Sequence, residues 1–426
     1  MPNFMQLTPT LLVGVGGIGC WIADQVYGMA MEAGIPWSKR IRILGFDTDR
    51  GDLAKLRHLG DDQLVQTSTA ETVFTLLTRY GNQIADWFVD DDALVTEIRQ
   101  MSLLPGAGQI RMLSRLAFAG ALTDGLKLAQ IDNAVLGIAT QDNRSDFQGH
   151  VNVLLVGSVA GGTGSGMFLQ AALLLGARIR ARGMTPEVRG LFLLPDIPVL
   201  AARLPVQQVP ATRANGYAAL RELHAIRMTT SGQTDRPVRF EYQMGEGLKP
   251  DAVPFASVVL MDFETQTGSN LGRGIDGYKE LAAKAAYTLL FTPLGSTFQS
   301  GIVNEVRQRL EAAATGGDNS FAGVGLASIV YPETAMLDYL ALSYGVTMLE
   351  GHWLRLDTTF RAELDRYHVR VANGETNLER PRRGDSYVRN LEQLALQERV
   401  RFFREIHAAV HPKVEDAQGN ETVRIR

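Results

Sequence analysis

The sequence predicts a doubly wound α/β fold, in which helices cover both faces of a mainly parallel sheet, with a smaller α+β second domain. Between Leu11 and Met261, short apolar runs alternate with segments of helical spacing, which is typical of parallel strands joined by crossover helices. Glycine-rich turns directly follow the apolar runs Leu11–Val15 and Val151–Val156, as they do in sheets that bind nucleotides. After Met261 the alternation stops, so a second domain is expected there.

The predicted elements follow from apolar runs and from apolar periodicity. The predicted strands are Leu11–Val15, Ile41–Phe46, Val151–Val156, Val188–Leu194 and Phe255–Met261. The predicted helices are Trp21–Ala33, Thr72–Phe88, Arg111–Ile131, Met167–Arg182 and Ala211–Met228. Together they predict one large sheet with helices between its strands.

The rest of the chain predicts a connecting helix and a second domain. A length of 426 residues is too great for one small core and fits one large domain plus a smaller one. Gly277–Leu290 has the pattern of a long helix, Phe321–Tyr331 that of a strand, and Ala335–Trp353 that of another helix. A domain boundary is therefore expected near Thr292. The expected division is a large domain over 1–273, a central helix over 274–292, and a smaller domain with a mobile tail over 293–426.

Composition is that of an ordinary soluble globular protein, with 45% hydrophobic and 21% charged residues. A formal net charge of -4 gives no broad attraction to nucleic acid or anionic lipid. The single cysteine, Cys20, indicates a reducing compartment. The longest apolar run, Met167–Ala177, is much shorter than the roughly 20 residues that cross a bilayer. We therefore expect a cytoplasmic protein without membrane insertion. The arginine-rich segment 380–404 is either a solvated helix face or a docking surface for a protein partner.

The first glycine loop, Gly14–Gly19, reads GVGGIG and lies between a predicted strand and a predicted helix. Glycines let the backbone approach a ligand closely, and the free amides of the following helix attract phosphate. Asp47 and Asp49 follow the next strand, where an acidic residue often contacts a ribose. The alternative reading is that these glycines serve only tight packing of helix against strand.

The second glycine loop, Gly161–Gly166, reads GGTGSG and follows the predicted strand Val151–Val156. Four glycines in this run provide a cradle of backbone N–H groups, and Thr163 and Ser165 add hydroxyl donors. No lysine follows the loop, so it is not the GxxxxGK[ST] loop that carries its own cation. Phosphate here would be held by amides, hydroxyls and a helix dipole, with Mg²⁺ supplying positive charge. No side-chain metal site is expected.

Four motifs together resemble the tubulin/FtsZ superfamily. GGTGSG resembles the signature loop of tubulins and FtsZ, and GVGGIG resembles the opening loop of FtsZ. Phe46–Asp49 resembles the acidic turn after that family's second strand, and Gly106–Gly108 resembles its γ-phosphate loop. The motifs occur in the family's order. The resemblance implies a bacterial tubulin-like protein with a GTPase-like domain, a central helix and an activation-like domain, which binds GTP or GDP and assembles into filaments.

The resemblance also implies which residues contact the nucleotide. In the loops these are Gly16, Gly17, Ile18, Cys20, Asp47, Asp49, Gly106, Ala107, Gly108, Gly161, Gly162, Thr163, Gly164 and Ser165. Arg213 and Asn215 match positions where the family contacts the ribose and base. Asn215 is either a base-recognition residue, because an amide both donates and accepts, or a satisfied helix-start residue. Tyr278 either stacks on a base or packs as an ordinary aromatic.

Catalysis departs from the family pattern. The family carries an acidic motif in a loop after the central helix, which positions water for the neighbouring subunit's nucleotide. The corresponding stretch here offers only Asn304 and Glu305, so these are the candidate catalytic residues, with a surface glutamate as the alternative for Glu305. The resemblance therefore supports nucleotide binding more firmly than hydrolysis.

Two other functions fit parts of the sequence. GVGGIG with Phe46–Asp49 also resembles the opening of Rossmann-type or adenylating enzymes that use NAD, FAD or ATP. That reading leaves the GGTGSG loop unexplained. The other alternative is a scaffold that keeps a bound nucleotide without hydrolysing it.

Overall fold

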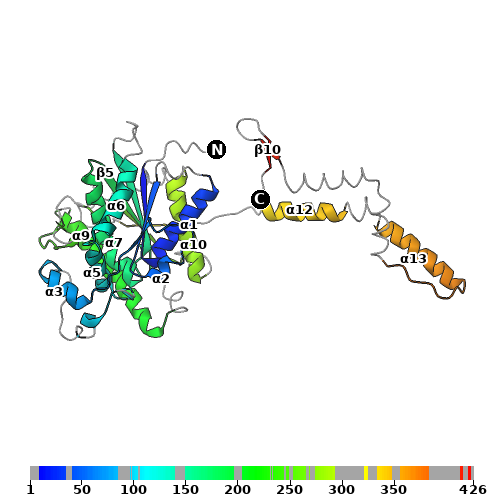
Figure 1. Ribbon diagram of the computed structural model, residues 1–426, viewed down its shortest axis with the longest axis horizontal. Helices are drawn as coiled ribbons and strands as arrows, with labels where there is room; N and C mark the ends of the chain where they lie inside the picture. The colour runs from blue at the N-terminus through cyan, green and yellow to red at the C-terminus, as the bar shows by residue number, and fades with distance from the viewer. Residues whose placement is uncertain are drawn as a thin grey trace. The chain divides into compact units, whose positions relative to one another are not determined.

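The structure is a computed structural model of the 426-residue chain (Figure 1). It describes residues 9–34, 41–84, 96, 98–103, 106–139, 149–195, 204–230, 232, 234–243, 246–248, 253–264, 268, 274–292, 321–324, 333–347, 356–382, 413–415 and 421–423. The chain divides into two compact units, Met1–Ala327 and Ser328–Arg426. The first unit contains the glycine loops.

A seven-stranded sheet forms the centre of the first unit, with strand order β3-β2-β1-β4-β5-β8-β9. Every neighbouring pair of strands is parallel. The strands are β1 Thr10–Val15, β2 Ile41–Asp47, β3 Leu64–Gln66, β4 His150–Ser158, β5 Thr185–Leu193, β8 Ser257–Met261 and β9 Phe321–Gly323. A small antiparallel pair, β6 Glu241–Gln243 and β7 Glu246–Gly247, lies outside this sheet. The predicted doubly wound parallel fold is confirmed.

Helices cover both faces of this sheet (Figure 1). The helical elements of the unit are α1 Gly16–Glu32, α2 Arg50–Leu53, α3 Val73–Ile84, α5 Arg111–Ala121, α6 Gly125–Ala139, α7 Gly162–Arg180, η4 Val206–Gln208, α9 Val209–Thr230 and α10 Gly274–Phe291. Residues of α1 and α10 share one buried cluster, whereas residues of α6, α7 and α9 share another. The central helix expected over 274–292 is therefore part of this layer, packed beside α1.

Alternation along the strands explains why the sheet has two cores. In β1, Leu11, Val13 and Val15 belong to the cluster on the α7 side. Leu12 belongs to the cluster on the α1 side. Successive side chains of a strand point to opposite faces, and all four of these residues are at most 1% exposed. An uninterrupted apolar run is what a strand between two helical layers requires.

The direction of winding reverses between β1 and β4. From β1 the chain moves outward through β2 to β3, and it then returns to place β4 on the other side of β1. The carboxyl ends of the two strands lie together, because Val15 pairs with Gly157. Ligands of open α/β sheets bind in the crevice outside the carboxyl ends of the strands at such a reversal. This edge of the sheet is where α1 and α7 begin.

The single helix predicted over Arg111–Ile131 is wrong. The structure has two helices, α5 and α6, separated by a short turn. The Thr123 hydroxyl donates to Gly120 O at 2.7 Å, and Asp124 Oδ1 accepts from Leu126 N at 2.9 Å. Side chains of this type compete with the helical backbone pattern and favour helix ends and turns. The polar pair therefore ends α5 and starts α6.

Helices α1 and α7 begin earlier than apolar periodicity predicts. α1 starts at Gly16 rather than near Trp21, and α7 starts at Gly162 rather than near Met167. Glycine has low intrinsic helix propensity, which hides these first turns from a sequence pattern. Most of the second glycine loop is thus the first turn of a helix.

The second unit has two described helices and a short strand pair. They are α12 Glu333–Thr347, α13 Leu356–Ala372, and the antiparallel strands β10 Lys413–Glu415 and β11 Glu421–Val423. The division between the units falls after Ala327, beyond the boundary expected near Thr292, because β9 joins the large sheet. Most of the arginine-rich segment 380–404, from residue 383 onward, lies outside the described residues. Within the described part of the chain, no helix has the length and apolar character to cross a membrane.

Candidate functional site

A cavity of about 320 Å³ opens at the reversal between β1 and β4. Its walls come from the starts of α1 and α7, the turn after β2, and the turn before α5. The lining residues are Val15, Gly16, Gly17, Ile18, Asp47, Thr48, Asp49, Asp52, Gly106, Ala107, Gly108, Gln109, Ser158, Gly161, Gly162, Thr163 and Gly164. All four motifs of the sequence therefore meet at one site.

Two helix N-termini open on this cavity. Neither the start of α1 at Val15 nor the start of α7 at Gly161 has a side-chain cap, and neither first turn contains an acidic residue. The first amides of a helix have no intrahelical partner and carry a partial positive charge. The short helix α2 differs, because Asp49 Oδ1 accepts from Gly51 N at 2.7 Å. Because the N-termini of α1 and α7 are uncapped and open on the same cavity, their first backbone N–H groups are available to bind an anion.

Glycine at the two helix starts is required by close packing. Gly16 has φ +73, and a Cβ there would lie 2.9 Å from Gly164 N. A Cβ on Gly162 would lie 2.3 Å from Gly108 O. Any side chain at these positions would push the walls of the cavity apart.

The turn before α5 is shaped by two glycines and tied to the rest of the site. Gly106 and Gly108 have φ values of 104 and 56, which L-residues rarely adopt. Asn215 Nδ2 donates to Gln109 O at 3.0 Å and to Ala160 O at 3.2 Å. Asn215 is thus a satisfied side chain on α9 that joins this turn to the segment before α7.

Thr48 connects three of the cavity walls and was not among the residues expected from the sequence. Its hydroxyl accepts from Ala107 N at 3.2 Å and pairs with the Thr163 hydroxyl at 3.0 Å. Thr48 is 1% exposed, and its bond to Ala107 N is buried. One hydroxyl after β2 therefore positions both the turn before α5 and the start of α7.

Replacing Thr48 by valine is expected to lower the free energy of unfolding by about 1–3 kcal/mol, because the Ala107 amide loses its buried partner. The same change is expected to weaken ligand binding in the cavity, since two walls lose their common anchor. Urea denaturation and calorimetric titration of nucleotide measure the two effects. Thr48→Ser keeps the hydroxyl and is the matched control, expected to lose less than half as much stability. Equal losses in the two variants would assign the effect to packing alone.

Three carboxylates form the acidic wall of the cavity: Asp47, Asp49 and Asp52. Asp47 Oδ1 accepts from Asp49 N at 3.2 Å. Its Oδ2 is buried and has no hydrogen-bond partner among the described residues. Burial, followed by the nearby charges of Asp52 and Asp49, raises the pKa of Asp47 to about 7, despite backbone hydrogen bonds that lower it. A buried, unpaired carboxylate oxygen facing a cavity is suited to a ligand that brings positive charge.

The carboxylates fit a divalent cation that is bound together with phosphate. A Cβ on Gly17 would lie 2.6 Å from Asp52 Oδ2 and 3.2 Å from Asp47 Oδ2, so both oxygens face the same glycine. Mg²⁺ usually takes one or two carboxylates, several waters and substrate phosphates rather than a full protein cage. Within the described residues, no group of three or more His, Cys, Asp or Glu side chains gathers as a complete metal site.

Several residues expected at the site lie outside the cavity lining. Cys20 is buried inside α1, where its thiol donates to Gly14 O and Phe46 O. Tyr278 is 3% exposed, donates to Met261 O and packs edge-on against Phe263. Arg213 is exposed on α9.

Ser165 turns its hydroxyl back to Gly161 O within the first turn of α7 at 2.5 Å. Its hydroxyl thus closes that turn instead of lining the cavity. Asn304 and Glu305, the candidate catalytic residues, lie outside the described residues.

Thr48, Asp52 and Gln109 line the cavity without having been expected there. A glutamine two residues before α5 carries no sequence signal of its own. Its position after Gly106–Gly108 is the only hint, and that hint depends on recognising the turn.

Comparison with known protein families agrees with the motifs. The family described as "Tubulin like" matches residues 11–350. Among solved structures, CetZ1 from Haloferax volcanii, a GDP-bound monomer, is 14% identical over 66% of this chain and 58% of that chain, with a TM-score of 0.36. TubZ of Bacillus thuringiensis serovar israelensis, a GTPγS-form protofilament, is 14% identical over 67% and 57%, also with a TM-score of 0.36.

CetZ from Methanosaeta thermophila is 15% identical over 67% of this chain and 53% of that chain, with a TM-score of 0.37. The chain thus spans little more than half the length of these structures. Among curated proteins, none matches the sequence.

Proposed function

Because this chain belongs to the tubulin-like protein family, we propose that its cavity binds the phosphates of a guanine nucleotide, GTP or GDP. The observation that carries the proposal is that two uncapped helix starts and the Gly106–Gly108 turn open on one cavity at the reversal of the sheet. Backbone amides and helix N-termini are the groups that hold phosphate in sites without a lysine. The volume of about 320 Å³ is within the range of small-molecule sites.

We propose Mg²⁺ as the companion of the phosphates. Asp47 and Asp52 are the residues that would hold it, because their Oδ2 atoms face the same glycine, and Asp49 lies beside them in the lining. The unpaired, buried Oδ2 of Asp47 supports this assignment. When bound, the cation would neutralise phosphate charge next to the acidic wall.

We further propose that copies of the chain assemble into filaments, with GTP hydrolysis completed at the interface between subunits. Family membership supports this step. Asn304 and Glu305 are the proposed residues for positioning water in the neighbouring site. A nucleotide-bound protein without turnover is the alternative outcome.

The test is binding of GTP, GDP and ATP in the presence of Mg²⁺, with phosphate release followed as protein concentration rises. Sedimentation in the same samples reports assembly. Turnover per subunit that climbs with concentration, together with pelleting, would support hydrolysis at an interface. Tight GTP binding with flat turnover would leave a nucleotide-bound scaffold. Tighter binding of ATP than of GTP would contradict the guanine assignment, and no binding of any nucleotide would overturn the proposed function.

A further inference from the structure

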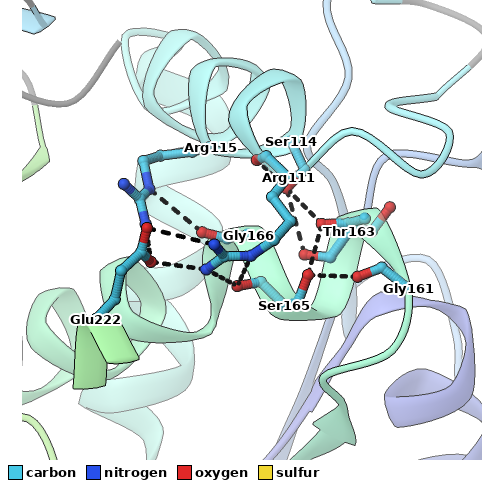
Figure 2. A network of polar contacts seen from close by, with 9 residues as sticks. Arg111, Ser114, Arg115, Gly161, Thr163, Ser165, Gly166 and Glu222 are labelled. Carbon is cyan, nitrogen blue, oxygen red and sulfur yellow. Dashed lines mark hydrogen bonds and ion pairs between the residues drawn. The ribbon is translucent and has the colours of Figure 1, made fainter. Parts of the chain in front are cut away.

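Two arginines of α5 and one glutamate of α9 form a cluster beside the first turn of α7 (Figure 2). We call Arg111, Arg115 and Glu222 the guanidinium clamp. Arg111 Nη2 and Arg115 Nη2 both contact Glu222 Oε2, at 2.6 and 2.5 Å. The arginines are one helical turn apart, so both side chains leave the same face of α5.

The same two arginines also bind the backbone of α7. Arg111 donates from Nε and Nη2 to Ser165 O at 3.2 and 2.9 Å, and Arg115 Nε donates to Gly166 O at 3.4 Å. Ser114, between them, donates to Gly162 O at 2.9 Å. Figure 2 shows the arginine side chains directed at Ser165 and Gly166, near the start of α7. The turn whose amides face the cavity is therefore held from behind by α5.

The clamp contains two positive side chains and one negative side chain. The guanidinium groups of Arg111 and Arg115, which remain protonated in proteins, both pair with Glu222. The side chains of Arg111 and Arg115 are 12% and 8% exposed, whereas that of Glu222 is 33% exposed. The Arg115 guanidinium also lies 4.9 Å from the ring centroid of Phe240. The more buried charges are thus positive, and burial reduces their screening by water and salt.

The described residues that line the cavity include no lysine or arginine. Among the described residues that line it, the charged side chains are Asp47, Asp49 and Asp52. A phosphate chain placed against this acidic wall needs positive charge beyond that of backbone amides. The P-loop supplies that charge with a lysine, and the GGTGSG run has none.

We propose that Arg111 and Arg115 are positioning residues whose positive charge, held behind the first turn of α7, stabilises phosphate bound on the cavity side of that turn. This inference rests on the proposed nucleotide site. It adds that the charge of the clamp, and not only its packing, sets the affinity for the phosphates.

Two variants that break the same ion pair test charge against packing. Arg111→Gln removes one positive charge, and Glu222→Gln removes the negative one. Both are expected to lower thermal stability. Arg111→Gln is expected to weaken GTP binding by about fivefold, and Glu222→Gln is expected to tighten it by about fivefold. Removing one unit charge near the phosphates changes the binding free energy by this amount at an effective dielectric constant of about 20 to 40. Calorimetric titration with GTP and Mg²⁺ at low salt measures both effects.

Adding Glu222→Gln to Arg111→Gln gives a further readout. The double variant lacks the whole pair but has the charge balance of the parent, so it is expected to bind GTP more tightly than Arg111→Gln alone. GMP carries less charge than GTP, so its affinity is expected to change less in every variant. If the clamp acted through packing alone, the double variant would not bind GTP more tightly than Arg111→Gln. The affinities for GMP and GTP would also change by the same factor.

Glu187→Gln is the matched control. Glu187 pairs with Arg189 at 2.5 Å on β5, with a side-chain exposure of 35% that is close to that of Glu222. Glu187→Gln changes the net charge by the same amount as Glu222→Gln, but at a position away from the cavity. It is therefore expected to alter GTP affinity less than about twofold.

Weaker GTP binding in both single variants, in proportion to their loss of stability, would overturn the inference. So would equal changes for GMP and GTP. Failure of the parent protein to bind any nucleotide is a distinct result, because it overturns the proposed function itself.

Discussion

Alanine at position 162 is expected to weaken nucleotide binding about 10- to 100-fold, because overpacking that forces the backbone to shift costs roughly 1–3 kcal/mol. A Cβ there would meet Gly108 O at 2.3 Å, Gln109 C at 2.7 Å and Ile110 N at 2.7 Å. All three are backbone atoms, which cannot rotate away as a side-chain end does. The turn before α5 must therefore move, and it carries Ala107 and the bond to Thr48 with it. Titration of GTP with Mg²⁺, at a temperature where circular dichroism shows the variant folded, measures the loss.

Gly81→Ala on α3 is the control for this substitution. A Cβ on Gly81 would meet nothing within 4 Å, and alanine in a helix is favoured over glycine by about 0.5–1 kcal/mol. That variant is expected to be as stable as the parent or more so, with unchanged affinity. If Gly162→Ala bound nucleotide as tightly as Gly81→Ala, the contact between the start of α7 and the turn before α5 would not form part of the site.

Asp47→Asn is expected to make the ligand-free protein more stable than the parent above pH 7 and to change little near pH 4. The pKa of Asp47 is raised from 3.8 to about 7 in the folded protein, mainly by burial. Between these values the unfolded chain releases the proton while the folded protein keeps it. The free energy of unfolding therefore falls as pH rises through this window. A shift of this size corresponds to about 4 kcal/mol.

Urea denaturation of both proteins at pH 4, 5, 6, 7 and 8, with EDTA and without nucleotide, measures the effect. The difference between variant and parent is expected to grow from pH 5 to pH 7 and then level off. The low-pH samples act as the internal control, because both side chains are then neutral in the folded state. A difference that is the same at every pH would show that Asp47 ionises normally.

Local sequence patterns predicted the sheet and the glycine loops well. β1, β2 and β4 are apolar throughout most of their length, and glycines follow two of them, so each signal lies within a few neighbouring residues. β3 was missed because its three residues, Leu64–Gln66, are too short for a period to be seen. The break between α5 and α6 was missed because apolar periodicity continues across it. The Asp124–Gly125 dipeptide is a common turn signal, and hydrogen bonds of Thr123 and Asp124 form the turn.

Contacts between distant residues account for the parts of the site that sequence could not predict. Arg111 and Glu222 are 111 positions apart, and Thr48 and Thr163 are 115 apart. Neither spacing matches a sequence motif that would predict the contact. Cys20 lies close in sequence to a loop that lines the cavity, but its helix turns its thiol toward Gly14 and Phe46. Nearness in sequence to a motif was in this case a poor guide to contact with the ligand.

The edge strand β9 affects how this sheet can be completed during synthesis. It pairs with β8 through Val258 and Phe321, yet residues 262–320 are translated between the two strands. Until the ribosome has passed Gly323, the outer edge of β8 has no strand beside it. Unpaired sheet edges recruit other chains, and pairings between distant segments form slowly. The interval between translation of β8 and of β9 is therefore one in which a nascent chain has an exposed sheet edge, and a chaperone that covers this edge would protect it from aggregation.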